Sequence, residues 1–510
     1  MEVGIYMKNV LEMLENTGVR YPDKIAIYDE DSSLSYKDYL EKSKTIGSYL
    51  INYLDKQINK PIVVFIDRNI ESILTFMGIV YSGNTYVPID CSQPVERIRS
   101  MLNAINPVLL INANTTVNPA DFSKFEYMDF SNLFDSSINQ EDLNLIRNKT
   151  IDYDPVYIMF TSGSTGIPKG IAISHRSIID LIIQFHKTFE IDETSTYANQ
   201  APFDFDVSVK DIYNAMYSGG TIYIVPKKLF SSPPLLLNFL IDKEINTLVW
   251  ATSALRIIEN FDAFTVAIPS NLKLVMFSGE IMPNRILNYW RRYLPDTDFV
   301  NLYGPTEITC NCTYFKVNRK FDNEDSLPIG LPFQNSRVFL LDLENSSLIT
   351  ESNKKGEICV SGTSLALGYY NNEEQTNVSF VKNPIHNHFN ETIYKTGDIG
   401  YWNDNEELMF VSRKDSQIKH MGHRIELSEI EIKVYSFDEI SAAFCHHENE
   451  KIYLFYSSDQ EMNRELKRKL LKLLPKYMVP NQFVYVNEMP LNKNNKIDRK
   501  RIINEYFKSK

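Results

Sequence analysis

The sequence predicts an α/β protein with a large N-terminal domain of stacked α/β sheets, a β-rich subdomain and a small mobile α+β C-terminal domain. Apolar strand-like runs alternate with helical patterns: residues 62–66 precede an apolar helix through 73–81, and the alternation recurs at 171–189 and 247–251. Alternation of this kind is typical of parallel sheets. Several runs are apolar throughout, as expected where helices cover both faces of a sheet. At 510 residues, the chain is too long for one compact core.

The composition and the pattern of predicted elements change twice along the chain, and these changes set the predicted domain boundaries. Residues 1–412 form the N-terminal core, within which short strands and Gly/Asn/Asp turns from about 320 to 410 indicate the β-rich subdomain. A polar, charged bridge follows, and residues 416–510 are long enough for a small α+β domain. Near the N-terminus, Ser35 can cap a helix with Asp38 three residues on.

Composition excludes several classes of protein. The 43% hydrophobic and 23% charged residues are those of a globular protein, and a net charge of -12 argues against nonspecific nucleic-acid binding. No apolar run approaches the roughly 18 residues of a membrane helix, and acidic residues among the first thirty argue against a signal peptide. Five scattered cysteines without metal-ligand spacing indicate reduced thiols in a cytoplasmic protein.

The stretch at 161–170, Thr-Ser-Gly-Ser-Thr-Gly-Ile-Pro-Lys-Gly, follows an apolar strand-like run at 156–160. Its glycines allow backbone N–H groups to approach a phosphate, its hydroxyls add donors, and Lys169 adds a positive charge. A merely flexible Gly/Ser loop is the alternative, but the preceding strand and the closing lysine favour phosphate binding. No Walker A register can be drawn through it.

A second motif, Asn301-Leu-Tyr-Gly-Pro-Thr-Glu307, places a Gly-Pro turn after a strand. The turn would display Tyr303, Thr306 and Glu307 together, which suits base stacking, a phosphate contact and a Mg²⁺ ligand. The competing interpretation is an ordinary turn that binds no ligand and whose glutamate faces solvent.

Residues 161–170 and 301–307 resemble two signature motifs of the adenylate-forming (AMP-binding) superfamily, and further motifs follow in the family's order. They are Tyr394-Lys-Thr-Gly-Asp398, Ser412-Arg-Lys-Asp415, the 419–431 stretch and Asn492-Lys-Asn-Asn-Lys-Ile-Asp-Arg499. Ser412 replaces the usual hinge glycine, and Asn495 stands where glycine is usual. The resemblance covers essentially the whole chain. It is similar to stand-alone adenylation domains of the nonribosomal peptide synthetase type and to D-alanine–carrier protein ligases.

The resemblance implies a role for each matching residue. Tyr303 would stack on adenine, Asp398 would bind the ribose, Glu307 would hold magnesium, and Lys496 would be the catalytic lysine. Residues 413–415 would be the hinge, with Asp415 as pivot, and Gly422 would line the tunnel for a phosphopantetheine arm. The full set of ATP-binding residues would be Thr161, Ser162, Gly163, Ser164, Thr165, Gly166, Lys169, Gly279, Glu280, Asn301, Leu302, Tyr303, Gly304, Pro305, Thr306, Asp398 and Arg413.

The amino-acid-activating branch is favoured by Asp206, which lies where the family pairs an acid with the substrate's α-ammonium. A buried carboxylate needs such a cation, although Asp204 or Asp206 could instead cap a helix. By the same resemblance, the other residues of the substrate pocket would be Val207, Lys210, Ala254, Met276, Ser278, Leu302, Cys310, Asn311 and Lys496.

Lys210 is the unusual pocket residue, and three interpretations of it stay open. It could select an acidic amino acid, turn outward into solvent, or pair with Asp206 four residues away. The last would leave a small pocket of the kind expected for D-alanine. We slightly favour the acidic substrate.

The implied reaction is ATP- and Mg²⁺-dependent formation of aminoacyl-AMP with release of pyrophosphate, followed by transfer to the phosphopantetheine thiol of a carrier protein. The sequence contains no carrier-domain attachment motif, so we expect a separate carrier protein, with no membrane insertion. An acyl-CoA synthetase using coenzyme A is the remaining alternative, although it would not need Asp206.

Overall fold

The computed structural model describes residues 7–163, 166–415, 417–490 and 497–508. The chain divides into two compact units. The large unit comprises Met1–Cys91, Ala104–Phe160 and Gly170–Lys414, and the small unit comprises Ser92–Asn103, Thr161–Lys169 and Asp415–Lys510. Two segments that precede residue 170 therefore belong with the C-terminal part of the chain.

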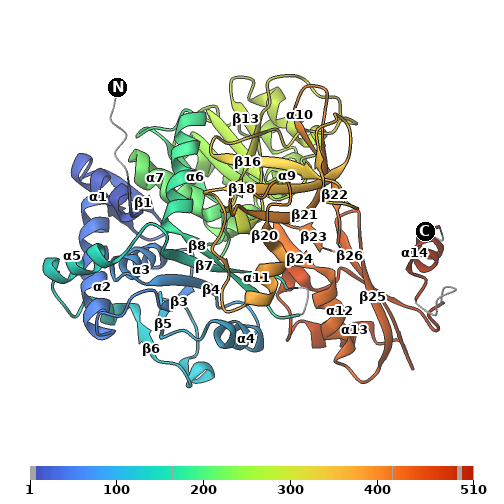
Figure 1. Ribbon diagram of the computed structural model, residues 1–510, viewed down its shortest axis with the longest axis horizontal. Helices are drawn as coiled ribbons and strands as arrows, with labels where there is room; N and C mark the ends of the chain where they lie inside the picture. Colours follow the sequence, from blue (N-terminus) through green and yellow to red (C-terminus); the bar gives the residue numbers. More distant parts are fainter. Residues whose placement is uncertain (1–6, 164–165, 416, 491–496, 509–510) are drawn as a thin grey trace. The chain divides into compact units, whose positions relative to one another are not determined.

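The large unit contains a nine-stranded sheet whose central strands are parallel, as the alternation of strands and helices predicts (Figure 1). Antiparallel strands lie at its two edges. In spatial order the strands are β15 (Leu331–Pro332), β14 (Thr313–Lys316), β13 (Asp298–Tyr303), β12 (Leu274–Ser278), β11 (Thr247–Ala251), β9 (Thr196–Asn199), β10 (Thr221–Ile224), β1 (Ile25–Tyr28) and β2 (Ser33–Ser35).

A seven-stranded sheet completes the α/β part of this unit. Its interior strand β3 is buried along its whole length and pairs in parallel with β4 and β5. In order the strands are β19 (Gly368–Tyr369), β8 (Lys169–Ser174), β7 (Pro155–Thr161), β4 (Thr85–Asp90), β3 (Pro61–Ile66), β5 (Leu109–Asn112) and β6 (Tyr127–Asp129).

Helices cover these sheets, and one apolar core joins them. Ile27 and Tyr197 of the first sheet and Ile62 and Tyr157 of the second belong to the same buried cluster. The helices are α1 (Leu11–Arg20), α2 (Tyr36–Tyr53), α3 (Ile70–Tyr81), α5 (Gln140–Lys149), α6 (His175–Thr188), α7 (Val207–Ser218), α8 (Pro233–Asp242), α9 (Thr252–Asn260), α10 (Asn284–Tyr293) and α11 (Glu373–Ser379). Helix α4 (Val95–Ile105) belongs mostly to the small unit. The expected cap of α2 is confirmed, because Ser35 accepts a hydrogen bond from the Asp38 amide.

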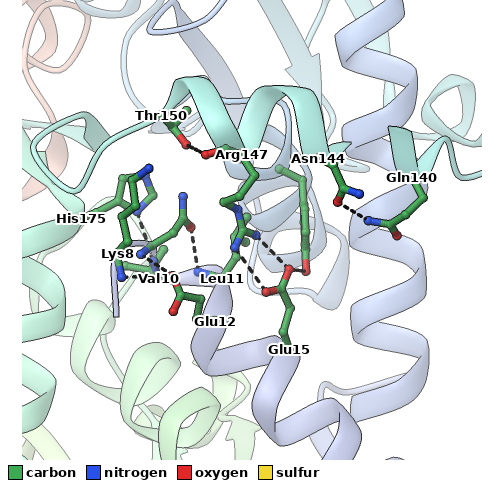
Figure 2. A network of polar contacts seen from close by, with 12 residues as sticks. Lys8, Val10, Leu11, Glu12, Glu15, Gln140, Asn144, Arg147, Thr150 and His175 are labelled. Atoms are coloured by element: carbon green, nitrogen blue, oxygen red, sulfur yellow. Dashed lines mark hydrogen bonds and ion pairs between the residues drawn. The ribbon is translucent and has the colours of Figure 1, made fainter. Parts of the chain in front are cut away.

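Buried and half-buried polar contacts fix helix α1 to its neighbours (Figure 2). The Val10 amide donates to Nδ1 of His175 over 3.2 Å, and Arg147 of α5 donates to Glu15 over 2.8 and 3.3 Å. Burial and the nearby Arg147 charge lower the pKa of His175 to about 3. The ring is therefore neutral at physiological pH and keeps Nδ1 as an acceptor.

The predicted β-rich subdomain is an antiparallel sheet. Its order is β17 (Leu348–Ile349), β16 (Ser336–Leu341), β18 (Gly356–Gly362), β21 (Thr392–Trp402) and β20 (Phe380–Lys382), and β22 (Leu408–Arg413) pairs with β21. The sheet surrounds a separate buried cluster that includes Val360 and Tyr394.

The small unit is α+β, as predicted. It contains the hairpin β23 (Gln417–His420) and β24 (His423–Glu426), the helices α12 (Leu427–Tyr435), α13 (Asn463–Leu470) and α14 (Arg499–Lys508), and a sheet of β25 (Ile440–Glu448), β26 (Lys451–Ser458) and β27 (Gln482–Tyr485). A buried ion pair between Arg97 and Glu429 attaches α4 to α12. None of the helices in the described residues has the length and hydropathy needed to cross a bilayer.

Candidate active site

The predicted phosphate loop joins β7 to β8. Two of its glycines, Gly163 and Gly166, occupy positions that a residue with a side chain would not fit or would rarely adopt. A Cβ on Gly163 would lie 2.0 Å from the carbonyl oxygen of Ile167, which no side chain tolerates. Gly166 has a φ of +79° and donates its N–H to the Gly163 carbonyl over 3.0 Å. Both glycines therefore allow a close approach of backbone groups that other residues would hinder. Ser164 and Thr165 lie outside the described residues.

The Ser162 hydroxyl is held by the backbone of β24 in the small unit. It donates to the Arg424 carbonyl over 2.8 Å and accepts from the Glu426 amide over 3.1 Å. Burial raises the pKa of Glu426, and the charges of Arg424 and Lys169 oppose that rise. The phosphate loop and β24 thus form one polar cluster, which the sequence did not predict.

The second motif lies at the end of β13, and Gly304 permits a close approach there. A Cβ at this position would meet the Cys310 carbonyl oxygen at 2.6 Å and the Asn311 Cα at 2.7 Å. Asn301 is fixed by donating its side-chain amide to the Pro328 carbonyl over 2.8 Å. The short 3₁₀ helix η5 (Thr306–Ile308) follows, so Thr306 and Glu307 lie directly after the strand end.

Two residues expected to bind the nucleoside, Tyr303 and Arg413, both contact a third, Asp398. The Tyr303 hydroxyl donates to Asp398 Oδ2 over 2.5 Å, and Arg413 Nη1 donates to Asp398 Oδ1 over 2.8 Å. Asp398 and Arg413 face each other across β21 and β22. Burial and the Asp398 charge raise the pKa of Tyr303 well above its usual value, so the phenol stays protonated as a donor.

Glu307 is 1% exposed, and its carboxylate accepts a hydrogen bond from the Tyr369 hydroxyl over 2.8 Å. Its backbone carbonyl also accepts from the Ala366 amide. The described residues contain no group of three or more His, Cys, Asp or Glu side chains arranged for a metal. A single buried carboxylate still fits Mg²⁺, because this ion usually takes one or two protein carboxylates together with substrate phosphates.

Gly279 and Glu280 follow β12 directly. Gly279 has a φ of +93°, a left-handed conformation that favours glycine. The Glu280 carbonyl accepts from the Thr252 hydroxyl at the start of α9 over 3.4 Å. The turn is therefore fixed beside the C-terminal end of the strand, where ligands of α/β sheets bind.

The predicted pocket residues lie at the ends of neighbouring elements of the large unit. Met276 and Ser278 are on β12, Leu302 is on the adjacent β13, Ala254 is on α9, and Val207 and Lys210 are on α7. Met276, Leu302 and Cys310 belong to the same buried cluster. Asp206 occupies the N-cap position of α7, but its side chain makes no cap hydrogen bond.

Lys210 points inward and is fully buried, so the outward-turned interpretation is wrong. Its ammonium donates to Asn311 Oδ1 over 3.0 Å and to Ser278 Oγ over 3.4 Å. No carboxylate in the described part of the chain lies within ion-pair distance of the Lys210 ammonium. Burial raises the pKa of the adjacent Asp211 to about 7, opposed by a hydrogen bond from Asn199 and by the Lys210 charge.

The segment that supplies Asn311 has an uncommon backbone. Thr309 and Cys310 have φ values of 56° and 75°, in the left-handed region that residues other than glycine rarely adopt. The buried Thr309 hydroxyl donates to the Ser364 carbonyl over 2.7 Å. Strained conformations of this kind cluster at functional sites, and this one aims Asn311 at Lys210.

Other predicted residues are elsewhere or outside the described part of the chain. Asp415 accepts a hydrogen bond from the Gln417 amide over 3.2 Å. Gly422, with a φ of +82°, forms the turn between β23 and β24 together with Met421, whose φ is 53°. Lys496 lies outside the described residues. Sequence reasoning missed Tyr369 altogether, and only its aromatic neighbourhood in a Gly-Tyr-Tyr run could have suggested it.

Residues 14–370 match the model of the AMP-binding enzyme family. The D-alanine–D-alanyl carrier protein ligase of Bacillus cytotoxicus is 30% identical over 97% of this chain and 99% of its own. A component of the mycosubtilin synthase of Bacillus subtilis is also 30% identical over 97% of this chain, which spans only 19% of that protein.

Solved structures show the same fold. A nonribosomal peptide synthetase protein containing adenylation and PCP domains superimposes with a TM-score of 0.84 at 24% identity, covering 98% of this chain and 84% of that one. A Vibrio cholerae adenylation domain in complex with glycyl-adenosine-5'-phosphate gives a TM-score of 0.82 at 20% identity, covering 100% and 99%.

Proposed function

The chain belongs to the AMP-binding enzyme family, and from that premise we propose that it activates an acidic amino acid with ATP and loads it onto a carrier protein. The substrate carboxylate attacks the α-phosphate of ATP, which gives aminoacyl-AMP and pyrophosphate. The phosphopantetheine thiol of the carrier protein then attacks the acyl carbon and displaces AMP. All five cysteines are free thiols, which supports a cytoplasmic location for this reaction.

The residues of the site supply binding and charge stabilisation for this reaction. The loop at 161–169 would hold the phosphates, and the Tyr303–Asp398–Arg413 group would hold the nucleoside. Mg²⁺, bound by Glu307, would neutralise phosphate charge in the transition state. Lys496 would stabilise the negative charge that develops as the carboxylate attacks, and Asp206 would pair with the substrate ammonium.

One observation carries the choice of substrate: Lys210, Ser278 and Asn311 have hydrogen-bond donors that no acceptor among the described residues uses. Two of the three ammonium donors of Lys210 are used by Asn311 and Ser278. The Ser278 hydroxyl accepts from Lys210, so its own hydrogen is available to another acceptor. Asn311 Nδ2 is buried, and no hydrogen-bond partner for it exists among the described residues. A carboxylate has the acceptors and the charge to satisfy this cluster.

D-alanine is the second candidate, favoured by the names of several relatives. Its methyl group would leave the same donors unpaired in a buried site, which typically costs about 1–3 kcal/mol for each group. When alanine is bound, Lys210 would also have no carboxylate of the described residues within ion-pair distance. We therefore expect both L- and D-alanine to be poorer substrates than aspartate and glutamate.

The test is amino-acid-dependent ATP–pyrophosphate exchange over all proteinogenic amino acids, both enantiomers of alanine, aspartate and glutamate, and simple fatty and aryl acids. We expect aspartate or glutamate to give the highest kcat/KM, and Asp206→Ala to abolish exchange while ATP binding persists. Exchange with D-alanine above both acidic amino acids would establish the second candidate. Exchange only with fatty or aryl acids would contradict amino-acid activation itself.

A further inference from the structure

A basic surface lies on α13 and the turn after it, in the small unit. Residues 464–476 contain six Lys or Arg and one Glu, in a chain whose net charge is -12. Arg464, Lys467, Arg468 and Lys472 are exposed, and Lys476 continues the surface beyond the helix. Leu471 lies among them and is 42% exposed.

Helical geometry places these residues on one face. The Leu471 amide donates to the Lys467 carbonyl over 3.0 Å, so the helical turn continues past Leu470. Successive residues of a helix are about 100° apart, which puts Arg464, Lys467, Arg468 and Lys472 around Leu471. The opposite face packs into the core through Leu466 and Leu470, which are fully buried. We call the surface formed by residues 464, 467, 468, 471 and 472 the α13 basic face.

The cations of this face form no ion pairs within the part of the chain that the structure describes, although Glu461 and Glu465 are close to Arg464 in the sequence. Lys469, which points to one side, pairs with Glu439 over 2.6 Å and with Glu465 over 3.3 Å. No ion pair among the described residues involves Arg464, Lys467, Arg468 or Lys472. Like charges three or four residues apart on a helix repel one another, so the cations of this face destabilise the helix that carries them.

Two ordinary explanations account for only part of this pattern. Cations in the last turn of a helix interact favourably with its dipole, which explains Lys467 and Arg468. Arg464 lies in the first turn, where the dipole disfavours a positive charge, and Lys472 lies beyond the helix end. Solubility alone does not require a leucine exposed among four cations. A partner with an acidic surface and an apolar contact explains both features.

We propose that the α13 basic face is the docking surface for the carrier protein, which meets it with an acidic face and an apolar side chain seated on Leu471. The inference rests on the proposed function, because that function requires a separate protein to deliver the thiol. An enzyme with a net charge of -12 repels an acidic partner overall. A local basic face overcomes this repulsion by steering the encounter and fixing its orientation.

The experiment compares a protein thiol with a small one. The thiol acceptors are the phosphopantetheinylated D-alanyl carrier protein of Bacillus cytotoxicus and free pantetheine, which has no protein surface to dock. The test variant is Lys467→Glu/Lys472→Glu. Its matched control is Lys37→Glu/Lys42→Glu, which reverses two exposed lysines at the same spacing of five residues on α2.

We expect the test variant to raise the KM for the carrier protein about tenfold, because steering by local charge changes association rates by about 10–10³-fold. Transfer to pantetheine and ATP–pyrophosphate exchange should stay at the wild-type rate in both double variants. Raising salt from about 50 to about 500 mM should weaken carrier loading by the wild type and the control, and change the test variant much less.

Three outcomes would overturn the proposal. They are an unchanged carrier KM in the test variant, an equal rise in the control, or wild-type loading of the carrier no better than loading of pantetheine. A second pair, Lys467→Gln/Lys472→Gln, removes the charges without introducing acids and should give a smaller rise in KM of the same kind. Failure of the proposed function itself would be distinct, since it would appear in ATP–pyrophosphate exchange by the wild type, as a preference for another substrate or as no exchange with any amino acid.

Discussion

Substitution of Lys210 by methionine tests the substrate assignment most directly. Methionine has similar length and is apolar, so it fills the buried volume and removes only the charge and the donors. If Lys210 holds the distal carboxylate of the substrate, its loss removes a hydrogen bond to a charged group, worth about 1.5–3 kcal/mol. This energy corresponds to a decrease of about 10- to 150-fold in kcat/KM for aspartate or glutamate.

The same substitution should spare the fold. It deprives Asn311 Oδ1 of a donor, which costs about 1–3 kcal/mol. It also removes a fully buried cation that has no carboxylate partner among the described residues, and burying a charge costs several kcal/mol. We therefore expect the free energy of unfolding, measured in urea, to be unchanged or higher.

The assay is ATP–pyrophosphate exchange with glutamate, aspartate, methionine and both enantiomers of alanine, for the wild type and Lys210→Met. The control is Lys42→Met, which changes an exposed lysine on α2. Preference should move toward uncharged side chains in the first variant alone. An unchanged ratio of glutamate to alanine would refute the reasoning, as would a wild type that prefers alanine from the start.

Three further predictions concern other parts of the molecule. Tyr369→Phe removes the hydroxyl that donates to Glu307 over 2.8 Å, so it should increase the Mg²⁺ concentration needed for half-maximal exchange. It should also weaken Mn²⁺ binding in the presence of ATP, measured by electron paramagnetic resonance, whereas the control Tyr370→Phe should change neither quantity. His175 has a pKa of about 3 in the fold and about 6.5 when unfolded, so its contribution to stability is complete above pH 6.5 and decreases as pH falls, by about 2 kcal/mol at pH 5. His175→Asn keeps an acceptor but does not titrate, so urea titrations of this variant should show a weaker dependence of the free energy of unfolding on pH. Lys496→Ala should abolish exchange yet leave thioester formation from a supplied aminoacyl-adenylate intact, and equal loss of both half-reactions would contradict its assignment.

Much of the fold follows from local pattern. The fully apolar strand β3, the cap at Ser35 and the Gly-Pro turn after β13 each depend on residues close together in the sequence. The same is true of the phosphate loop, where short-range contacts demand glycine at position 163. Parallel strands also end at one edge of a sheet, so motifs that directly follow such strands lie along a common edge.

The partners within the site could not be predicted in this way. Tyr369 contacts Glu307 across 62 residues, and Tyr303 contacts Asp398 across 95. Such contacts depend on which strands are neighbours and in what register, and hydrophobic periodicity does not encode either. Ser162 is a clearer example of a partner that the sequence does not reveal. The composition of the stretch at 161–170 indicated that Ser162 binds phosphate, yet its hydroxyl forms hydrogen bonds with the backbone of β24.

The substrate pocket shows why the sequence left three interpretations of Lys210 open. On α7 alone, Asp206 and Lys210 are four residues apart, and a helical pair is the local expectation. What directs the ammonium elsewhere is Asn311, which depends on left-handed backbone at Thr309 and Cys310. Neither residue type favours that conformation, and each such strain costs about 1–3 kcal/mol. The surrounding fold must offset that cost, so the pocket chemistry depends on tertiary packing that no local pattern around Lys210 records.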